Sequence, residues 1–366
     1  MTSYRVAMLG GDGVGPEVCA VARACVDALG RRFDFEVTWL EAFVGGAAID
    51  RDGRPLPART LQACREADAV LLGAVGGPRW DDPSAAMRPE DALLGLRAEL
   101  ELFANLRPVR ADDALADSSP LRPEVRRGAD LLIVRELTGG LYFGRPQGRE
   151  VVDGQPGAVD TLRYTRPEID RIVRLGFELA AGRRNHLTSV DKANVLASSR
   201  LWREVVSELA GTYPSVTVEH ALVDSTAYLL LTEPGRFDVI VTENLFGDIL
   251  SDEAAAIAGS LGLLPSASLG SRTTEHGRFG MYEPVHGSAP QIAGKGVANP
   301  LATVASAAMM LQLSLGEIEA GEALDAATAL TIDAGPRTPD LGGSATTADV
   351  AAFLLEQLVQ PSVVAA

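Results

Sequence analysis

The chain alternates short apolar runs with longer amphipathic runs, which is the pattern of an α/β protein. Strands are predicted over residues 4–9, 35–42, 68–75, 129–137, 186–191, 216–224 and 237–244. Helices are predicted from Pro16 to about Leu29 and over about 91–103. Pro16 suits the first helical position, and Glu17 complements the positive end of the same helix.

The last three predicted strands each end at a polar residue and run into a predicted helix. In α/β sheets, binding sites collect at the carboxyl ends of strands. Residues 76–90, rich in Gly, Pro and Asp, predict a long functional loop. A second long loop is predicted over 270–300, followed by Ala-rich helices to the end of the chain.

Length and charge narrow the class of protein. The 366 residues exceed one ordinary core, so two domains are expected. A formal net charge of −16 disfavours nucleic acid and anionic membrane surfaces as partners. The N-terminal apolar run is too short for a signal peptide, and we expect a cytoplasmic protein without a membrane span. The most apolar stretch, 297–315, contains Asn, Pro and Gln and predicts a loop and a tightly packed helix.

Three cysteines, Cys19, Cys25 and Cys64, have no spacing typical of metal ligands. We expect them to be reduced and buried.

The segment GGDGVG (10–15) follows a predicted strand and opens a helix, which is the setting of a dinucleotide-binding fingerprint. The spacing fails, because Pro16 stands where the third glycine is needed. We therefore predict a tight turn that brings the chain close to other groups, and not a Rossmann site.

The segment NLFGDILSD (244–252) carries Asp248 and Asp252 four residues apart. On a helix this spacing puts two like charges on one face, about 5–6 Å apart at Cβ. The alternative is that Asp248 caps the helix and Asp252 is solvated. Asp224 ends a predicted strand in LVDSTAY and adds a third carboxylate. Three oxygen ligands of this kind predict a Mg²⁺ or Mn²⁺ site.

Basic residues in apolar contexts are the other candidates. Lys192, in VDKANVL, stands at a predicted strand end; near a cation its charged form is disfavoured, which suits a general base. Arg97, Arg107 and Arg135 offer planar forks for carboxylates. Tyr142 lies between Gly-rich turns. The alternatives are a surface lysine, separate salt bridges and a core tyrosine. Together the set suits an α-hydroxy polycarboxylate that chelates the metal.

Long motifs in chain order now support a resemblance. They include GGDGVGPEV, LLGAVGGPRWD, RPEDALLGLR, LFANLRP, LLIVRELTGGLYFG, SVDKANVL, NLFGDILSD, EPVHGSAPQIAGKGVANP and PDLGGSA. Over nearly its full length the chain resembles the β-decarboxylating dehydrogenase family of isocitrate and isopropylmalate dehydrogenases. The resemblance implies two α/β domains around a large mixed sheet. It implies a cofactor-binding domain at 1–102 and 259–366, and a substrate, metal and dimerisation domain at 103–258.

The resemblance also implies residue roles. The malate carboxylates are held by Arg97, Arg107 and Arg135. The divalent cation, Mg²⁺ or Mn²⁺, is bound by Asp224, Asp248 and Asp252, and Asp224 also lies against the substrate. Lys192 takes the hydroxyl proton, and Tyr142 protonates the enol carbon. In the family Lys192 and Asp224 reach the site from the partner subunit, which implies a homodimer with shared active sites.

The family binds its dinucleotide without a Rossmann motif, through segments that resemble 286–299 and 76–90 here. The implied cofactor residues are Glu90, His286, Gly287, Ser288, Ala289, Gln291, Ile292, Ala298, Asn299 and Asp340. NAD-using isopropylmalate enzymes usually have Asp in place of Gln291. NADP-using relatives have Lys-Tyr where this chain has Gln291-Ile292. We expect NAD, with weaker rejection of NADP.

Leu93 and Leu94 stand one turn before Arg97. An apolar pair suits an isopropyl group, and a carboxylate buried against it without a partner is unfavourable. The expected reaction is oxidative decarboxylation of 3-isopropylmalate to 4-methyl-2-oxopentanoate and CO₂ with reduction of NAD, in leucine biosynthesis. The alternatives are leucines that belong to the core, a paralogue acting on tartrate or another 3-substituted malate, and a non-catalytic cation-binding protein of the same fold.

Overall fold

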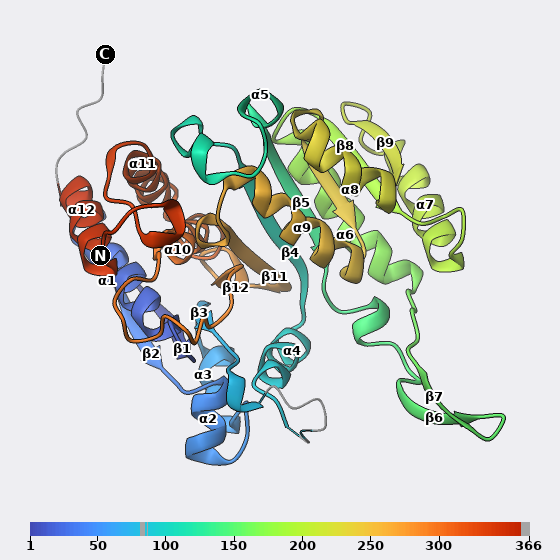
Figure 1. Cartoon of the computed structure of the whole chain (residues 1–366), viewed down its shortest axis with the longest axis horizontal. Helices are drawn as coiled ribbons and strands as arrows, with labels where there is room; N and C mark the ends of the chain where they lie inside the picture. The colour runs from blue at the N-terminus through green and yellow to red at the C-terminus, as the bar shows by residue number, and fades with distance from the viewer. Residues whose placement is uncertain (81–84, 86, 360–366) are drawn as a thin grey trace. The chain divides into compact units, whose positions relative to one another are not determined.

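The computed structural model describes residues 1–80, 85 and 87–359, and the chain forms two compact units (Figure 1). Unit 1 consists of Met1–Leu102, Asp112–Ser119 and Ala258–Ala366. Unit 2 consists of Phe103–Ala111 and Pro120–Ile257. Among the described residues the large mixed sheet has ten strands, of which five fall mainly in each unit. The predicted α/β class with a large mixed sheet is confirmed.

In unit 1 the strand order is β2 (Phe35–Glu41), β1 (Thr2–Gly11), β3 (Ala69–Ala74), β12 (Arg278–Pro284) and β11 (Pro265–Thr273). Neighbours are parallel except β11 and β12, which are antiparallel. The helices are α1 (Gly15–Phe33), α2 (Gly45–Asp52), α3 (Ala58–Glu66), α4 (Glu90–Glu99), α10 (Leu301–Leu313), α11 (Ile318–Ala334) and α12 (Thr347–Val359). Every residue of β3 is buried, as expected for an apolar parallel strand covered on both faces.

In unit 2 the order is β4 (Leu102–Arg110), β5 (Asp130–Glu136), β10 (Val239–Thr242), β8 (His186–Asp191) and β9 (Thr217–Leu222). Only β4 runs antiparallel to its neighbour β5. The helices are α5 (Pro123–Arg126), α6 (Arg166–Ala181), α7 (Ala197–Ala210), α8 (Val223–Thr232) and α9 (Asn244–Ala258). A separate hairpin of β6 (Gly148–Val152) and β7 (Gln155–Val159) extends from this unit (Figure 1).

The predicted helix over 91–103 is wrong at its end, and the strand that follows was not predicted. Helix α4 stops at Glu99, and Glu101 takes a left-handed φ of 53°, which ends the helical path. Strand β4 then begins at Leu102 and is buried along most of its length. The apolar run LFANLRPV therefore belongs to a buried strand, which periodicity alone does not separate from a helix.

The predicted loop over 270–300 is also partly wrong. Strand β11 continues to Thr273, and β12 occupies Arg278–Pro284, so the irregular segment starts only after Pro284. Asp224 does not end a strand, because β9 stops at Leu222 and Asp224 lies in the first turn of α8.

The Ala-rich helices are confirmed as α10, α11 and α12, and the last residues, 360–366, lie outside the described chain. Helix α10 begins after the loop predicted at the start of 297–315. In the described ranges no helix is both long and apolar enough to cross a membrane. Cys19, Cys25 and Cys64 are buried as expected, and burial raises the pKa of each thiol to about 12.

The glycine-rich turn after β1 is tight, as predicted. Gly11 and Gly13 have φ values of 70° and 58°. A Cβ at Gly11 would lie 1.9 Å from the carbonyl oxygen of Ala74, and one at Gly13 would lie 1.9 Å from that of Ser288. No side chain fits at these separations, so the two glycines let three backbone segments of unit 1 meet.

Asp12 lies between the two glycines and ties the turn to its neighbours. Its carboxylate accepts hydrogen bonds from the backbone N–H groups of Gly46, Ala47 and Gly76. The acidic residue of this motif therefore holds the chain together locally, because it satisfies buried backbone donors.

Candidate active site

Helix α9 carries both Asp248 and Asp252, as the sequence predicted. The helix begins at Asn244, and the carboxylate of Glu243 accepts hydrogen bonds from the N–H groups of Leu245 and Phe246 at 3.2 and 2.9 Å. Burial raises the pKa of Glu243. The cap of α9 is therefore Glu243, and the alternative that Asp248 caps the helix is wrong.

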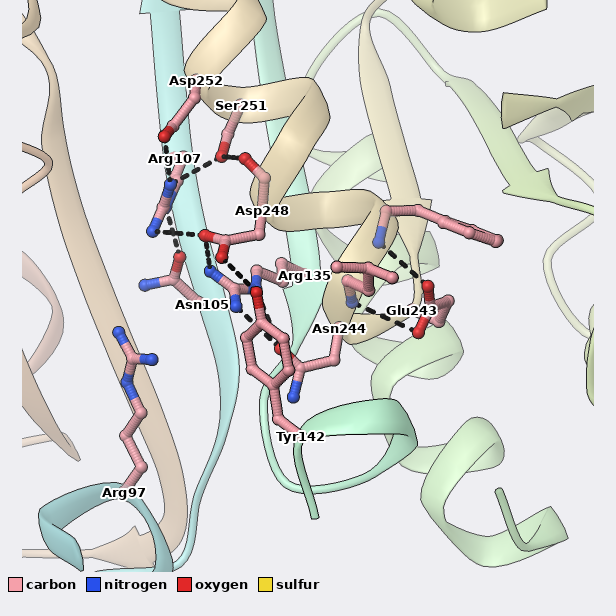
Figure 2. Close-up of polar contacts among 12 residues, drawn as sticks. Arg97, Asn105, Arg107, Arg135, Tyr142, Glu243, Asn244, Asp248, Ser251 and Asp252 are labelled. Atoms are coloured by element: carbon pink, nitrogen blue, oxygen red, sulfur yellow. Dashed lines mark hydrogen bonds and ion pairs between the residues drawn. The ribbon is translucent and has the colours of Figure 1, made fainter. Parts of the chain in front are cut away.

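Asp248 is contacted by three predicted site residues of unit 2, which are Arg135, Tyr142 and Arg107 (Figure 2). Arg135, at the carboxyl end of β5, donates from Nη1 to Asp248 Oδ1. The Tyr142 hydroxyl donates to Asp248 Oδ2 at 2.7 Å. Burial, followed by this hydrogen bond, raises the pKa of Tyr142 to about 12. Tyr142 therefore stays protonated at neutral pH and can serve as a proton donor.

Arg107, on β4, contacts the second aspartate. Its Nη1 donates to Asp252 Oδ1 at 3.2 Å and to Ser251 Oγ at 2.6 Å, and its Nη2 lies 3.6 Å from Asp248 Oδ1. Burial raises the pKa of Asp252, whereas the charge of Arg107 opposes that shift. The repulsion between the two aspartates is thus offset by two arginines on adjacent antiparallel strands.

Lys192 and Asp224 form a separate pair. Lys192 follows the last residue of β8, and its Nζ lies 2.5 Å from Asp224 Oδ1. This hydrogen bond lowers the pKa of Asp224. The backbone N–H of Lys192 donates to Ser199 Oγ at 3.0 Å, and the preceding Asp191 is held by Arg203. The loop that carries Lys192 is therefore fixed on both sides.

Within the described part of this single chain, no three His, Cys, Asp or Glu side chains are grouped to hold a metal ion. Asp224 accordingly does not join Asp248 and Asp252 in one chain. The three-aspartate site remains a prediction that requires a second subunit.

The remaining substrate candidates lie on α4 in unit 1. Arg97 is buried and pairs with Glu283 at 3.2 Å. Leu93 packs against a buried cluster that includes Leu96, whereas Leu94 is half-buried. The core role is therefore supported for Leu93, and the substrate role of both leucines stays a prediction. Glu90 is the first residue of α4 and lies close to Gly76. A Cβ atom added at Gly76 would lie 2.9 Å from Oε1 of Glu90.

The predicted cofactor segment 286–299 is anchored at its two ends. Ser288 accepts a backbone hydrogen bond from Val14 at 2.9 Å, and Asn299 donates to Asp340 at 3.0 Å. Ala289 and Ile292 pack against a small buried cluster that contains Ala298. Gly287 and Gln291, in contrast, are exposed.

His286 lies two residues before the first of these anchors. Its Nδ1 is 2.9 Å from the carbonyl oxygen of Gly287, and burial lowers the pKa of the ring.

A pocket of about 340 Å³ in unit 1 is lined by residues of both predicted segments and of the glycine-rich turn. Gly11, Gly13, Gly76, Trp80 and Pro290 are among the lining residues. Its volume falls within the range of small-molecule sites, and its backbone walls allow close approach of a ligand. The carboxylate residues Asp12 and Asp50 also line this pocket. Residues 81–84 and 86 of the predicted 76–90 loop lie outside the described chain.

The sequence interpretation missed four residues that contact the predicted arginines. They are Asn105, Asn244, Ser251 and Glu283. All four stand inside motifs that were recognised, but the neutral side chains of the first three carry no signal of their own. Glu283 lies 186 residues from Arg97, and only the fold brings the two together.

Comparison with known proteins places this chain. The family model described as isocitrate/isopropylmalate dehydrogenase matches residues 5–354. The chain is 56% identical over 344 residues to a 3-isopropylmalate dehydrogenase of Geobacillus kaustophilus, covering 94% of this chain and 91% of the relative. It is 54% identical over 354 residues to that of Anaeromyxobacter dehalogenans, covering 97% and 99%. The crystal structure of isocitrate dehydrogenase from Methylococcus capsulatus superposes with a TM-score of 0.84 at 34% identity, covering 98% of this chain and 100% of that one. The chain therefore belongs to the isocitrate/isopropylmalate dehydrogenase family.

Proposed function

We propose that this chain oxidatively decarboxylates 3-isopropylmalate to 4-methyl-2-oxopentanoate and CO₂, with reduction of NAD, in leucine biosynthesis. The observation that carries the proposal is the cluster of Arg107, Arg135, Tyr142, Asp248 and Asp252 in unit 2. It combines carboxylate-binding, proton-donating and metal-binding groups. Relatives that carry the name 3-isopropylmalate dehydrogenase cover more than nine-tenths of the chain and support the choice of substrate.

The proposed division of labour follows the two parts of the chain. Residues 1–102 and 259–366 bind NAD through the segment 286–299 and its neighbours. Residues 103–258 bind the metal and make the dimer.

The donor set fits a divalent cation of the Mg²⁺ or Mn²⁺ type. Asp248 and Asp252 present carboxylate oxygens one helical turn apart, and the Asp252 side chain is 64% exposed and accessible. A bound cation would polarise the substrate oxygens and stabilise the negative charge that develops as CO₂ leaves.

The side chains of this protein supply the remaining steps. Arg107 and Arg135 hold malate carboxylates in place of their present aspartate contacts, and Arg97 does the same from α4. Lys192 removes the proton of the substrate hydroxyl as the hydride passes to the nicotinamide. Tyr142, whose hydroxyl is protonated at neutral pH as in any ordinary tyrosine, gives a proton to the enol carbon.

Exposed apolar side chains of unit 2 support a homodimer with shared sites. Val195, Tyr228 and Ile249 are 63%, 68% and 56% exposed. They stand close in sequence to Lys192, Asp224 and Asp248, respectively. A partner that covers this apolar surface would bring its own Lys192 and Asp224 to the Asp248 half-site.

Mixing two inactive variants tests the shared site. Lys192→Met and Asp248→Asn dimers, exchanged at equal amounts, are expected to regain about a quarter of wild-type activity, since about half of the dimers are mixed and each mixed dimer holds one intact site of two. The measurement is NADH formation after exchange is verified by mass spectrometry. Each variant passed alone through the same exchange is the control. Activity no greater than the mean of the two controls would show that each subunit completes its own site.

The substrate assignment is tested with a panel of malates in the presence of Mg²⁺ and NAD. We expect the highest kcat/KM for 3-isopropylmalate, with malate, tartrate and isocitrate well below it. The apolar side chains of Leu93 and Leu94 offer an isocitrate carboxylate no partner. A higher kcat/KM for isocitrate or tartrate would refute the assignment.

Gln291→Asp is expected to widen the NAD/NADP ratio of kcat/KM by about tenfold or more, equivalent to 1.4 kcal/mol. Gln291 is exposed on the predicted cofactor segment. A carboxylate there accepts a stronger hydrogen bond from the ribose diol and repels a 2′-phosphate. Steady-state kinetics with both coenzymes gives the ratio. The KM for 3-isopropylmalate should stay close to its wild-type value. An NAD/NADP ratio within twofold of wild type would show that Gln291 does not contact the ribose.

A further inference from the structure

The two active-site arginines of unit 2 are anchored in the same way. Asn244 Oδ1 accepts from Nε and Nη2 of Arg135 at 3.1 and 2.8 Å. Asn105 Oδ1 accepts from Nε of Arg107 at 2.7 Å. All four side chains are buried, and Asn105 stands directly opposite Arg135 in the β4–β5 ladder. Figure 2 shows both amides next to the guanidinium groups that they orient.

The chemistry of this arrangement is unusual in one respect. The Nε side of a guanidinium offers parallel donors that a carboxylate matches with two strong hydrogen bonds. Here both acceptors are neutral amides instead. A buried carboxylate would cancel most of the arginine charge, because interactions between charges are strong in a low-dielectric site. An amide oxygen fixes the orientation of the guanidinium without that loss of charge.

The charges around the site make the difference important. Arg107 and Arg135 already face two aspartates, Asp248 and Asp252. If Asn105 and Asn244 were acids, these two residues together with the two arginines and the two aspartates would carry a net negative charge. A dianionic substrate would then be repelled, whereas a divalent cation would be attracted.

Asn244 has a second task. Its Nδ2 donates to the carbonyl oxygen of Gly139 at 3.1 Å, and its backbone N–H donates to the Tyr164 hydroxyl at 2.9 Å. Gly139 precedes the short 3₁₀ turn that ends at Tyr142. One side chain therefore orients Arg135 and also ties the Tyr142 turn to the start of α9.

We propose that Asn105 and Asn244 are positioning residues that orient Arg107 and Arg135 through uncharged acceptors, which keeps the arginine charge available to the carboxylates of a dianionic malate. The proposal rests on the proposed function, because that function supplies the dianionic ligand. It adds two residues to the substrate site, and both must be uncharged as well as of the right shape.

The test replaces each amide by the acid of the same shape, Asn105→Asp and Asn244→Asp. We expect each to weaken 3-isopropylmalate binding by about tenfold or more, because it adds a like charge within the site. Mn²⁺ binding, measured by calorimetry without substrate, should be unchanged or tighter. Asn105→Asp leaves the Gly139 contact intact and remains informative if Asn244→Asp folds poorly.

Asn185→Asp is the matched control. Asn185 is exposed just before β8, at the opposite end of that strand from Lys192, and it receives the same change of charge. The Asn185→Asp variant should bind 3-isopropylmalate as tightly as the wild-type protein. The proposal would be overturned if Asn105→Asp bound 3-isopropylmalate within twofold of the wild-type affinity. It would also be overturned if 3-isopropylmalate and Mn²⁺ binding were lost in parallel, because a parallel loss indicates simple structural damage.

The wild-type protein is assayed first on the malate panel, so that the two hypotheses fail separately. If another malate proves to be the substrate, the proposed function is corrected and the variants are compared on that malate. The role of the asparagines is then judged by the same two binding measurements.

Discussion

Lys192→Met is expected to lower turnover of 3-isopropylmalate by about 10²–10⁴-fold, the usual contribution of a general base. Lys192 follows the buried end of β8, and its Nζ contacts Asp224. Methionine keeps the length of the side chain but cannot accept the hydroxyl proton. The measurement is kcat under saturating substrate, Mg²⁺ and NAD.

Two controls separate loss of the base from other effects. NAD affinity should stay close to wild type, because the proposed cofactor residues lie in unit 1. Lys192→Arg keeps the positive charge but remains protonated at all relevant pH values, so it should be nearly as inactive as the methionine variant. Turnover of Lys192→Arg within a few-fold of wild type would assign Lys192 an electrostatic role only.

Asp248→Asn is expected to weaken Mg²⁺ or Mn²⁺ binding by about a hundredfold or more, because one full charge next to a dication is removed. Asp224→Asn should also weaken Mg²⁺ or Mn²⁺ binding. Asp248 is central to its cluster, since Arg135 and Tyr142 both donate to it. Direct titration with Mn²⁺ measures the affinity, and activity in excess chelator measures the requirement.

The Asp248→Asn variant also removes the negative charge that pairs with a buried arginine, which lowers stability. Thermal unfolding of the metal-free proteins therefore accompanies the titration, so that only folded protein is compared. Asp333→Asn, on the exposed surface of α11 in unit 1, is a control for the loss of one negative charge elsewhere. Full wild-type activity in excess chelator would refute the metal requirement itself.

The local order of residues was sufficient for many features of this chain. The four-residue spacing of Asp248 and Asp252 required one helical face, and α9 provides it. Lys192 was expected at the end of a strand, and β8 ends one residue before it. Apolar runs of strand length gave most of the sheet. These features depend on periods of two or 3.6 residues, which neighbouring residues define by themselves.

Other features depend on contacts between distant parts of the chain. Strand β4 was missed because a short buried apolar run has no period of its own, and its place between other strands decides its conformation. Strands β11 and β12 were missed for a related reason, because each strand is completed by pairing with the other across a short turn.

Most charged residues of the site were predicted, as was Tyr142, whereas Glu283 and the neutral residues Asn105, Asn244 and Ser251 were missed. Charge in apolar surroundings identified four candidates, which are Arg107, Arg135, Asp248 and Asp252. Asn105 was not identified in this way, because its importance comes from lying opposite Arg135 in the antiparallel register of β4 and β5. The partner of Arg97 is 186 residues away, and the glycine-rich turn after β1 meets Ser288 only in the folded unit. Charge and period are properties of a segment, whereas register and packing exist only after the segments have been brought together.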